Sequence, residues 1–188
     1  MVKNNVDRLS RLINAVLDFQ TLESGKMEFK MEENDINEVV KEVQQMMLPL
    51  AEKKSLDFTL QLDEYLPRIK FDRDKIVQVL VNLVNNAFKF TDKGSIIITT
   101  GKGENFIQIA VRDTGSGIKE ENIQKLFQEF TQLQRKVGGT GLGLSICKKI
   151  VEAHKGKIWA GAPSASKEGG FDKGAVFYFT LPIKERRT

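Results

Sequence analysis

The segment from residue 73 to residue 90, RDKIVQVLVNLVNNAFKF, constrains the fold more than any other part of the sequence. On a helix of 3.6 residues per turn its apolar side chains form one broad face, made of Ile76, Val79, Leu80, Leu83, Val84 and Ala87. Asp72 precedes the segment, and its carboxylate can accept a hydrogen bond from a first-turn amide. We therefore expect a long amphipathic helix whose apolar face lies on a core.

Strand patterns and helix patterns alternate on both sides of this segment. A second helix is expected at 34–54, with Asp35 at its N-cap and Pro49 bending or ending it. Alternation of apolar and polar residues predicts half-buried strands at 27–34 and 56–62. The remaining expected elements are strands at 96–100, 105–112, 157–161 and 174–183, and helices at 119–130 and 142–155.

The first two dozen residues carry a different pattern. Apolar residues recur at alternating spacings of four and three, as in a coiled-coil seam, at Val2, Val6, Leu9, Ile13 and Val16. Gly25 follows as a suitable residue to end a helix. The predicted fold class is therefore α/β: a two-layer sandwich, with a mixed sheet and helices on one face, preceded by one long N-terminal helix.

Composition excludes several classes of protein. The 188 residues are 40% hydrophobic and 29% charged, as expected of a globular domain, and contain no apolar run long enough to cross a bilayer. A single cysteine, Cys147, cannot form an internal disulfide, which favours a cytoplasmic setting. The net charge of +4 is spread among acidic residues, so we expect no nucleic acid partner.

A polar stripe runs along one edge of the predicted helix at 73–90. Asn82, Asn86 and Lys89 fall at i, i+4 and i+7, and therefore project from the same side. An asparagine inside a helix is less favourable than alanine by roughly half a kcal/mol, so a function that offsets this is expected. A solvated face is the alternative. Amide oxygens suit Mg²⁺, and a lysine one turn away suits phosphate.

Two glycine-rich stretches follow, DTGSGI at 113–118 and GGTGLGLSI at 138–146. Neither has the spacing of a P-loop, and neither lies in a dinucleotide-binding βαβ unit. The second stretch opens a predicted helix, whose first amides form an anion site that no bulky side chain obstructs. The two stretches together indicate a site where backbone approaches a ligand closely.

The motifs NLVNNAFKFT, DTGSGI, LFQEF and GGTGLGLSI, in this order, resemble the N, G1, F and G2 boxes of sensor histidine kinases. These kinases share the GHKL superfamily with gyrase, the ninety-kilodalton chaperones and the mismatch-repair ATPases. The resemblance implies the Bergerat fold and the ATP-binding catalytic domain of a two-component protein-histidine kinase. Its implied cofactors are ATP and Mg²⁺.

The resemblance also implies a role for each motif residue. Asn86 would hold Mg²⁺, Asn82 would assist at the metal and phosphates, and Lys89 would touch phosphate, so that Asn86 and Lys89 serve catalysis. Asp113 would accept a hydrogen bond from the adenine amine. The other implied nucleotide contacts are Gly115, Gly117, Ile118, Phe130, Gly139, Thr140, Gly141, Leu142, Gly143 and Leu144.

The chain departs from the kinase pattern at its start. Residues 1–25 resemble the second helix of the dimerisation hairpin and 26–188 the catalytic domain, so we expect the first helix, with the phosphorylated histidine, to be absent from this sequence. His154 lies at the end of a predicted helix, where we expect a structural role. The resemblance thus implies transfer of the ATP γ-phosphoryl to a histidine on a hairpin outside this chain, for relay to a response regulator. It also implies that the parent protein is a homodimer, which a membrane segment elsewhere in the parent could anchor.

Three alternatives stay open at this stage. The chain could be a GHKL ATPase, a serine kinase of the same fold, or a nucleotide-binding fragment without activity of its own. Arg135 and Lys136 in the loop before the second glycine stretch could reach the γ-phosphate or simply be solvated. Phe127 and Phe130 are expected to anchor the preceding helix in the core.

Overall fold

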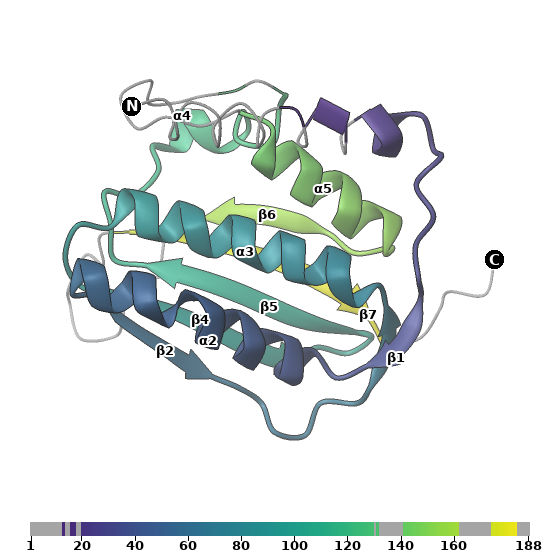
Figure 1. Cartoon of the computed structure of the whole chain (residues 1–188), viewed down its shortest axis with the longest axis horizontal. Helices are drawn as coiled ribbons and strands as arrows, with labels where there is room; N and C mark the ends of the chain where they lie inside the picture. Colours follow the sequence, from purple (N-terminus) through teal and green to yellow (C-terminus); the bar gives the residue numbers. More distant parts are fainter. Residues whose placement is uncertain are drawn as a thin grey trace.

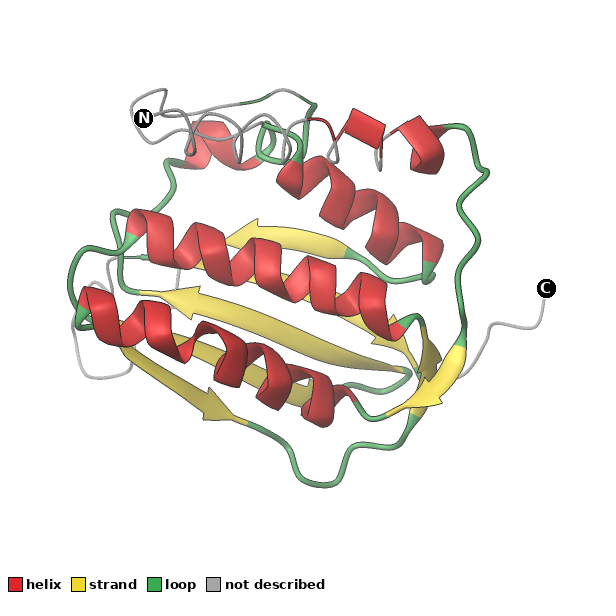
Figure 2. Ribbon diagram, in the orientation of Figure 1, coloured by secondary structure: helices red, strands yellow, loops and turns green. Residues whose placement is uncertain are grey.

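The computed structural model describes residues 13, 16, 17, 20–129, 131, 141–161 and 174–183. Helices α2 (Ile36–Lys54), α3 (Arg73–Phe90) and α5 (Gly143–Ala153) lie side by side across one face of a sheet (Figure 1; Figure 2). The core fills the space between these two layers. This arrangement confirms the predicted α/β sandwich with helices on one face of a mixed sheet.

The sheet contains five strands in the order β2-β4-β5-β7-β6. Their bounds are Asp57–Gln61 for β2, Ser95–Lys102 for β4, Phe106–Asp113 for β5, Ala175–Pro182 for β7 and Ile158–Gly161 for β6. β2 pairs with β4 in parallel and the other neighbours pair antiparallel, which makes the sheet mixed. The register places Asp113, at the end of β5, opposite Ala175 at the start of β7.

Helix α3 lies over the middle of the sheet, between α2 and α5 (Figure 1). Its N-cap is Asp72, whose side chain accepts from the backbone N–H of Lys75 at 3.0 Å. The helix buries the predicted apolar face together with Phe88: Ile76, Val79, Leu80, Leu83, Val84, Ala87 and Phe88. The predicted polar stripe of Asn82, Asn86 and Lys89 lies outside this buried face.

Helix α2 begins as predicted, because Asp35 accepts a hydrogen bond from the N–H of Asn37 at 2.8 Å. α2 continues past Pro49 to Lys54, which confirms the predicted extent of the helix and shows that Pro49 does not end it. Pro49 is exposed, whereas Met47 and Ala51 are buried. Proline has no backbone N–H to donate, and at Pro49 this break in the hydrogen-bonding lies on the exposed side of α2. The packing of buried residues on the other side holds the helix together.

The strand predicted at 27–34 is shorter than expected. Only Glu32–Asn34 forms a strand, β1, which pairs antiparallel with β3 (Ile69–Phe71) in a separate two-stranded sheet. Residues before Glu32 instead run along the end of α5. There the N–H of Lys30 donates to Asp72 Oδ2 at 2.8 Å, so a contact with a side chain replaces strand pairing.

Two further segments refine the predicted elements. The helix expected at 119–130 is helical only at α4 (Glu120–Ile123) and continues as turns. In the N-terminal segment, Ile13, Val16, Leu17 and residues 20–23 are helical, and Gly25 has the positive φ of +65° expected at a helix end. The other positions of the predicted seam lie outside the described residues.

No helix in the described ranges is long and apolar enough to cross a membrane.

His154 joins α5 to the start of α3, which confirms the predicted structural role. Its ring is buried, and Nε2 accepts from the backbone N–H of Asp72 at 2.9 Å. Because a backbone N–H can only donate, Nδ1 carries the proton and bonds Ile150 O at 2.8 Å. Burial lowers the pKa of His154, although the bond to Ile150 and the charge of Asp72 oppose this.

We expect this histidine to make the fold less stable in mild acid. Its pKa is lower in the folded than in the unfolded chain, so the unfolded state binds protons more readily. The stabilisation present above about pH 6.5 is therefore lost as the pH falls below that value. Urea unfolding between pH 5 and 7.5 measures the effect, and the non-titrating variant His154→Gln should show a flatter profile. Parallel profiles for the two proteins would contradict the assignment.

Candidate active site

The predicted polar stripe of α3 faces the space beside α5. Asn82, Asn86 and Lys89 are each half-buried, whereas Asn85, on another side of the helix, is exposed. The ammonium of Lys89 lies 5.3 Å from the centre of the Phe90 ring, and burial lowers the pKa of this lysine. The stripe therefore lines a partly enclosed surface.

Asp113 lies where β5 ends and is almost completely buried, with 3% of its surface exposed. Its Oδ1 accepts hydrogen bonds from the N–H of Gly115 at 2.9 Å and the N–H of Ala175 at 3.3 Å. Burial raises the pKa of Asp113, and the two backbone donors oppose that shift. The carboxylate is thus held in place by the loop that follows β5 and by the start of β7.

The first glycine-rich stretch rests on the C-terminal end of α3. A Cβ on Gly115 would come 2.2 Å from the carbonyl oxygen of Phe90, and the N–H of Ser116 bonds this oxygen at 3.2 Å. Gly117 has a φ of +74°, which few other residues adopt. Glycine at these positions lets the loop lie directly on the helix end, with Ile118 packed against the core beyond it.

The second glycine-rich stretch places the N-terminus of α5 against the stripe. A Cβ on Gly143 would lie 3.2 Å from Asn82 Oδ1, so the helix start and this amide are in close contact. Leu142, the N-cap residue, is buried and supplies no side-chain cap. The first-turn amides, from Gly143 on, therefore offer hydrogen-bond donors next to Asn82, while Leu144 is half-buried beside them.

Several predicted site residues lie outside the described residues. They are Phe130, Gly139 and Thr140, together with Arg135 and Lys136. Gly141, at the edge of this gap, has a φ of +75°. Phe127 is packed against the core with its ring edge-on to Phe177, at 6.4 Å between centroids, as expected of an anchor.

Sequence reasoning missed a third backbone element of the site. Gly174, with a φ of +129°, lies so close to β5 that a Cβ would come 1.9 Å from Asp113 O. The following residue, Ala175, donates one of the two bonds that hold the carboxylate. The signal was a lone glycine immediately before the last strand, which marks a close backbone approach.

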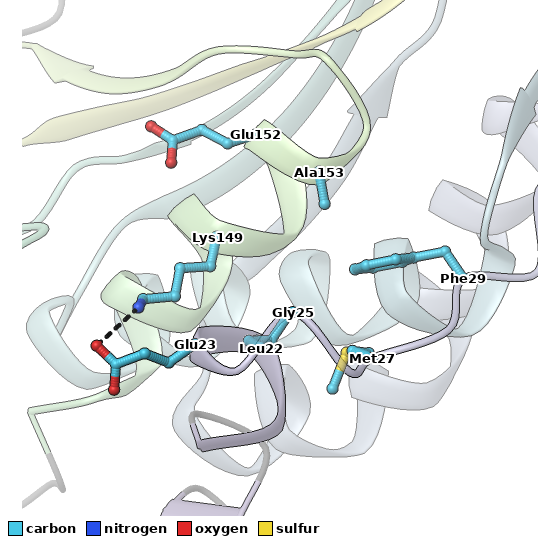
Figure 3. Close-up of a pocket in the computed structure, with 8 residues that line it drawn as sticks. All are labelled: Leu22, Glu23, Gly25, Met27, Phe29, Lys149, Glu152 and Ala153. Carbon is cyan, nitrogen blue, oxygen red and sulfur yellow. Dashed lines mark ion pairs between the residues drawn. The ribbon is translucent and has the colours of Figure 1, made fainter.

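A separate pocket lies at the other end of α5 (Figure 3). It has a volume of about 320 Å³ and is lined by Leu22, Glu23, Gly25, Met27, Phe29, Lys149, Glu152 and Ala153. Lys149 Nζ lies 3.8 Å from carboxylate oxygens of both Glu23 and Glu129. This lysine therefore connects α5 to the N-terminal segment and to the residues that follow α4.

Comparison with known proteins identifies the family. The family described as histidine kinase-, DNA gyrase B-, and HSP90-like ATPase matches residues 71–185, more than half of the chain. The chain belongs to this family and is a catalytic ATP-binding domain of the GHKL superfamily, with the fold of histidine kinase catalytic domains. The matched range contains all the motif residues discussed above.

Individual relatives support the same assignment. The sensor histidine kinase WalK of Bacillus subtilis is 33% identical over 194 residues, which cover 100% of this chain and 30% of WalK. Full-length ShkA in complex with AMPPNP matches 98% of this chain and 38% of its own, with a TM-score of 0.85 and 28% identity. Histidine kinase ThkA in complex with the response regulator protein TrrA matches 99% and 51%, with a TM-score of 0.78 and 31% identity. The chain spans between 11% and 30% of the curated relatives it matches first.

The close approach at Gly115 leads to a test of the site's architecture. We expect Gly115→Ala to lower the free energy of unfolding by about 1–3 kcal/mol, because the added Cβ would collide with Phe90 O. Gly101→Ala is the matched control, since a Cβ there meets nothing within 4 Å. Denaturant unfolding of both variants gives the comparison, and equal stabilities would show that the loop can move away from α3.

Proposed function

We propose that this chain is the ATP-binding catalytic domain of a sensor histidine kinase and binds ATP with Mg²⁺ at the α3 stripe. The observation that carries the proposal is the meeting of three chemically different groups around α3. A buried carboxylate would contact the base, half-buried amides the metal, and the N-terminus of α5 the phosphates. Membership of the family and the AMPPNP complex of ShkA support it.

The base would be recognised by Asp113. Within the part of the chain that the structure describes, both hydrogen bonds of Asp113 use Oδ1, so Oδ2 is the atom we assign to the exocyclic amine of adenine. The ring would be enclosed by Gly115, Gly117 and Ile118, since the two glycines allow the backbone to come within contact distance. A buried acceptor that is matched by a ligand donor discriminates strongly between bases.

The phosphates and Mg²⁺ would lie between α3 and the start of α5. Asn86 would be the metal ligand, Asn82 would lie at metal and phosphate, and Lys89 would approach the phosphates. Backbone donors at the N-terminus of α5 would come from Gly141, Leu142, Gly143 and Leu144. Phe130, Gly139 and Thr140 would also contact the nucleotide. Amide oxygens one turn apart suit a cation that completes its shell with phosphate and water, so these residues fit the group. When bound, Mg²⁺ neutralises charge on the transferring phosphoryl group.

The protein's contribution to catalysis would be positioning. Phosphoryl transfer needs in-line placement of donor and acceptor and stabilisation of charge, with little covalent participation by protein groups. Asn86 and Lys89 would supply this at the phosphates, while Asp113 fixes the other end of the nucleotide. The acceptor would be a histidine on a separate hairpin.

The chain would divide at residue 25. Residues 1–25 would form the second helix of the dimerisation hairpin, and 26–188 the catalytic domain. The parent protein would be a homodimer that passes the phosphoryl group to a response regulator, as the ThkA complex with TrrA suggests. Ile13 and Val16 expose 50% and 41% of their surface, which suits a seam that another helix covers.

The activity is tested by incubating the chain with γ-labelled ATP, Mg²⁺ and a separate histidine-bearing hairpin from a related kinase. We expect acid-labile label on the hairpin, and its loss in Asn86→Ala, which removes the proposed metal ligand from a half-buried position. Asn85→Ala, at the exposed neighbour, is the control and should leave labelling unchanged. Release of free phosphate without labelling would indicate an ATPase instead, and acid-stable label would indicate a serine kinase.

Base recognition is tested separately with Asp113→Asn. The variant keeps Oδ1 for Gly115 and Ala175 but presents an NH₂ group to the adenine amine, so two donors face each other. We expect ATP to bind about 10- to 100-fold more weakly, because a buried polar group is left unpaired, with stability close to wild type. Calorimetric titration measures the affinity, and wild-type binding by this variant would exclude Asp113 from the base site.

A further inference from the structure

The loop that follows β5 is fastened to the start of β4 by Thr114, a residue with no part in the function proposed above. The ladder between β4 and β5 has its last pair at Ile96 and Asp113. Thr114, the next residue, adds one more pair: its backbone N–H donates to Ser95 O at 3.1 Å, and its hydroxyl accepts from the N–H of Ser95 at 2.9 Å. The threonine side chain thereby takes the place of a backbone acceptor in this pair.

Room for this hydroxyl exists because the neighbouring position has no side chain. Gly94, which precedes Ser95, has a φ of +112°, and a Cβ on it would come 2.2 Å from Thr114 Oγ1. From the other side, a Cβ on Gly174 would come 3.0 Å from Thr114 Cα. The backbone at Thr114 therefore lies between two close approaches, and its hydroxyl fills the space that Gly94 leaves open.

Two attachments flank the backbone donor that holds Asp113. The hydroxyl of Thr114 attaches the loop on one side, and the N–H of Ser116 bonds Phe90 O at 3.2 Å on the other. Gly115 lies between them, and its N–H donates to Asp113 Oδ1 at 2.9 Å. The position of this donor is therefore set by the hydrogen bonds on either side of it.

The donor matters because an aspartate does not fix the orientation of its own carboxylate. The last torsion of the side chain has a broad minimum, so hydrogen bonds decide where each oxygen points. Oδ1 of Asp113 is bonded by the N–H groups of Gly115 and Ala175, and the direction of Oδ2 follows from these bonds. A shift of Gly115 would therefore turn Oδ2 away from the position assigned above to the adenine amine.

We propose that Thr114 is a positioning residue for base recognition: its hydroxyl holds the loop so that Gly115 orients the carboxylate of Asp113 toward the exocyclic amine of adenine. This inference rests on the proposed function. It makes the base preference of the site depend on a side chain that acts only through the loop. Thr114 is exposed, so a change there should leave the fold intact.

Calorimetric titration in the presence of Mg²⁺ tests this with two ligands, ADP and the diphosphate of purine riboside, whose base lacks the exocyclic amine. Thr114→Val keeps the branched shape but removes the acceptor for the N–H of Ser95. We expect about three- to tenfold weaker binding of ADP, the effect of losing one neutral hydrogen bond, and binding of the purine riboside diphosphate within about twofold of wild type. Removing the amine from the ligand serves as the second mutation of a double-mutant cycle, because only the adenine nucleotide uses Oδ2 of Asp113.

Three further variants separate positioning from packing. Thr114→Ser restores the hydroxyl and should recover most of the ADP affinity, which a loss of packing alone would not allow. Thr59→Val, the same change at an exposed position of β2, is the matched control and should bind both ligands as wild type. Gly94→Ala displaces the hydroxyl without altering Thr114, so it carries the same expectation as Thr114→Val and tests the contact if that variant does not fold.

The outcomes distinguish this inference from the proposed function. Unchanged ADP affinity in Thr114→Val, or equal weakening for both nucleotides, would overturn the role of Thr114 while leaving the nucleotide site in place. A wild-type chain that binds no ADP, or that binds both nucleotides equally, would overturn the base site assigned to Asp113, and the role of Thr114 with it.

Discussion

The burial of α3 against the middle of the sheet is the constraint on which the rest of the structure depends. Its apolar face fixes the helix in the core, so the polar edge that carries Asn82 and Asn86 has a fixed orientation. Both glycine-rich stretches are then positioned by contact with this one helix. Gly115 lies on its C-terminal end and Gly143 against its side, each at a distance that a side chain would obstruct.

The groups gathered around α3 differ in charge and in hydrogen-bonding character. The buried carboxylate of Asp113 is held by backbone donors from the loop after β5 and from the start of β7. Asn82 lies against the N-terminus of α5, and Asn86 and Lys89 follow it toward the C-terminal end of α3; these groups suit phosphate or its metal. Membership of the GHKL family gives this arrangement its interpretation, because an adenine nucleotide has an amine donor at one end and a polyanion at the other.

Much of this fold could be predicted from local sequence patterns. The caps at Asp35 and Asp72 and the apolar face of 73–90 act within one helix, so sequence reasoning placed α2 and α3 correctly. The predicted strand at 27–34 proved shorter, because the backbone of Lys30 bonds the side chain of Asp72, a contact distant in the sequence that no local pattern shows. The sequence likewise indicated the asparagine stripe and both glycine stretches. It gave no sign of the bond between His154 and the backbone N–H of Asp72, which only the packing of the end of α5 beside the start of α3 creates.

The central claim is that a Mg²⁺-bound adenine nucleotide occupies the space between α3 and the two glycine-rich stretches. A crystal structure with Mg²⁺ and a non-hydrolysable ATP analogue tests it most directly. The account requires the adenine amine at Asp113, the metal at Asn86 and the phosphates at the first amides of α5. A nucleotide bound elsewhere, or the same space filled by the protein's own side chains at saturating nucleotide, would contradict it.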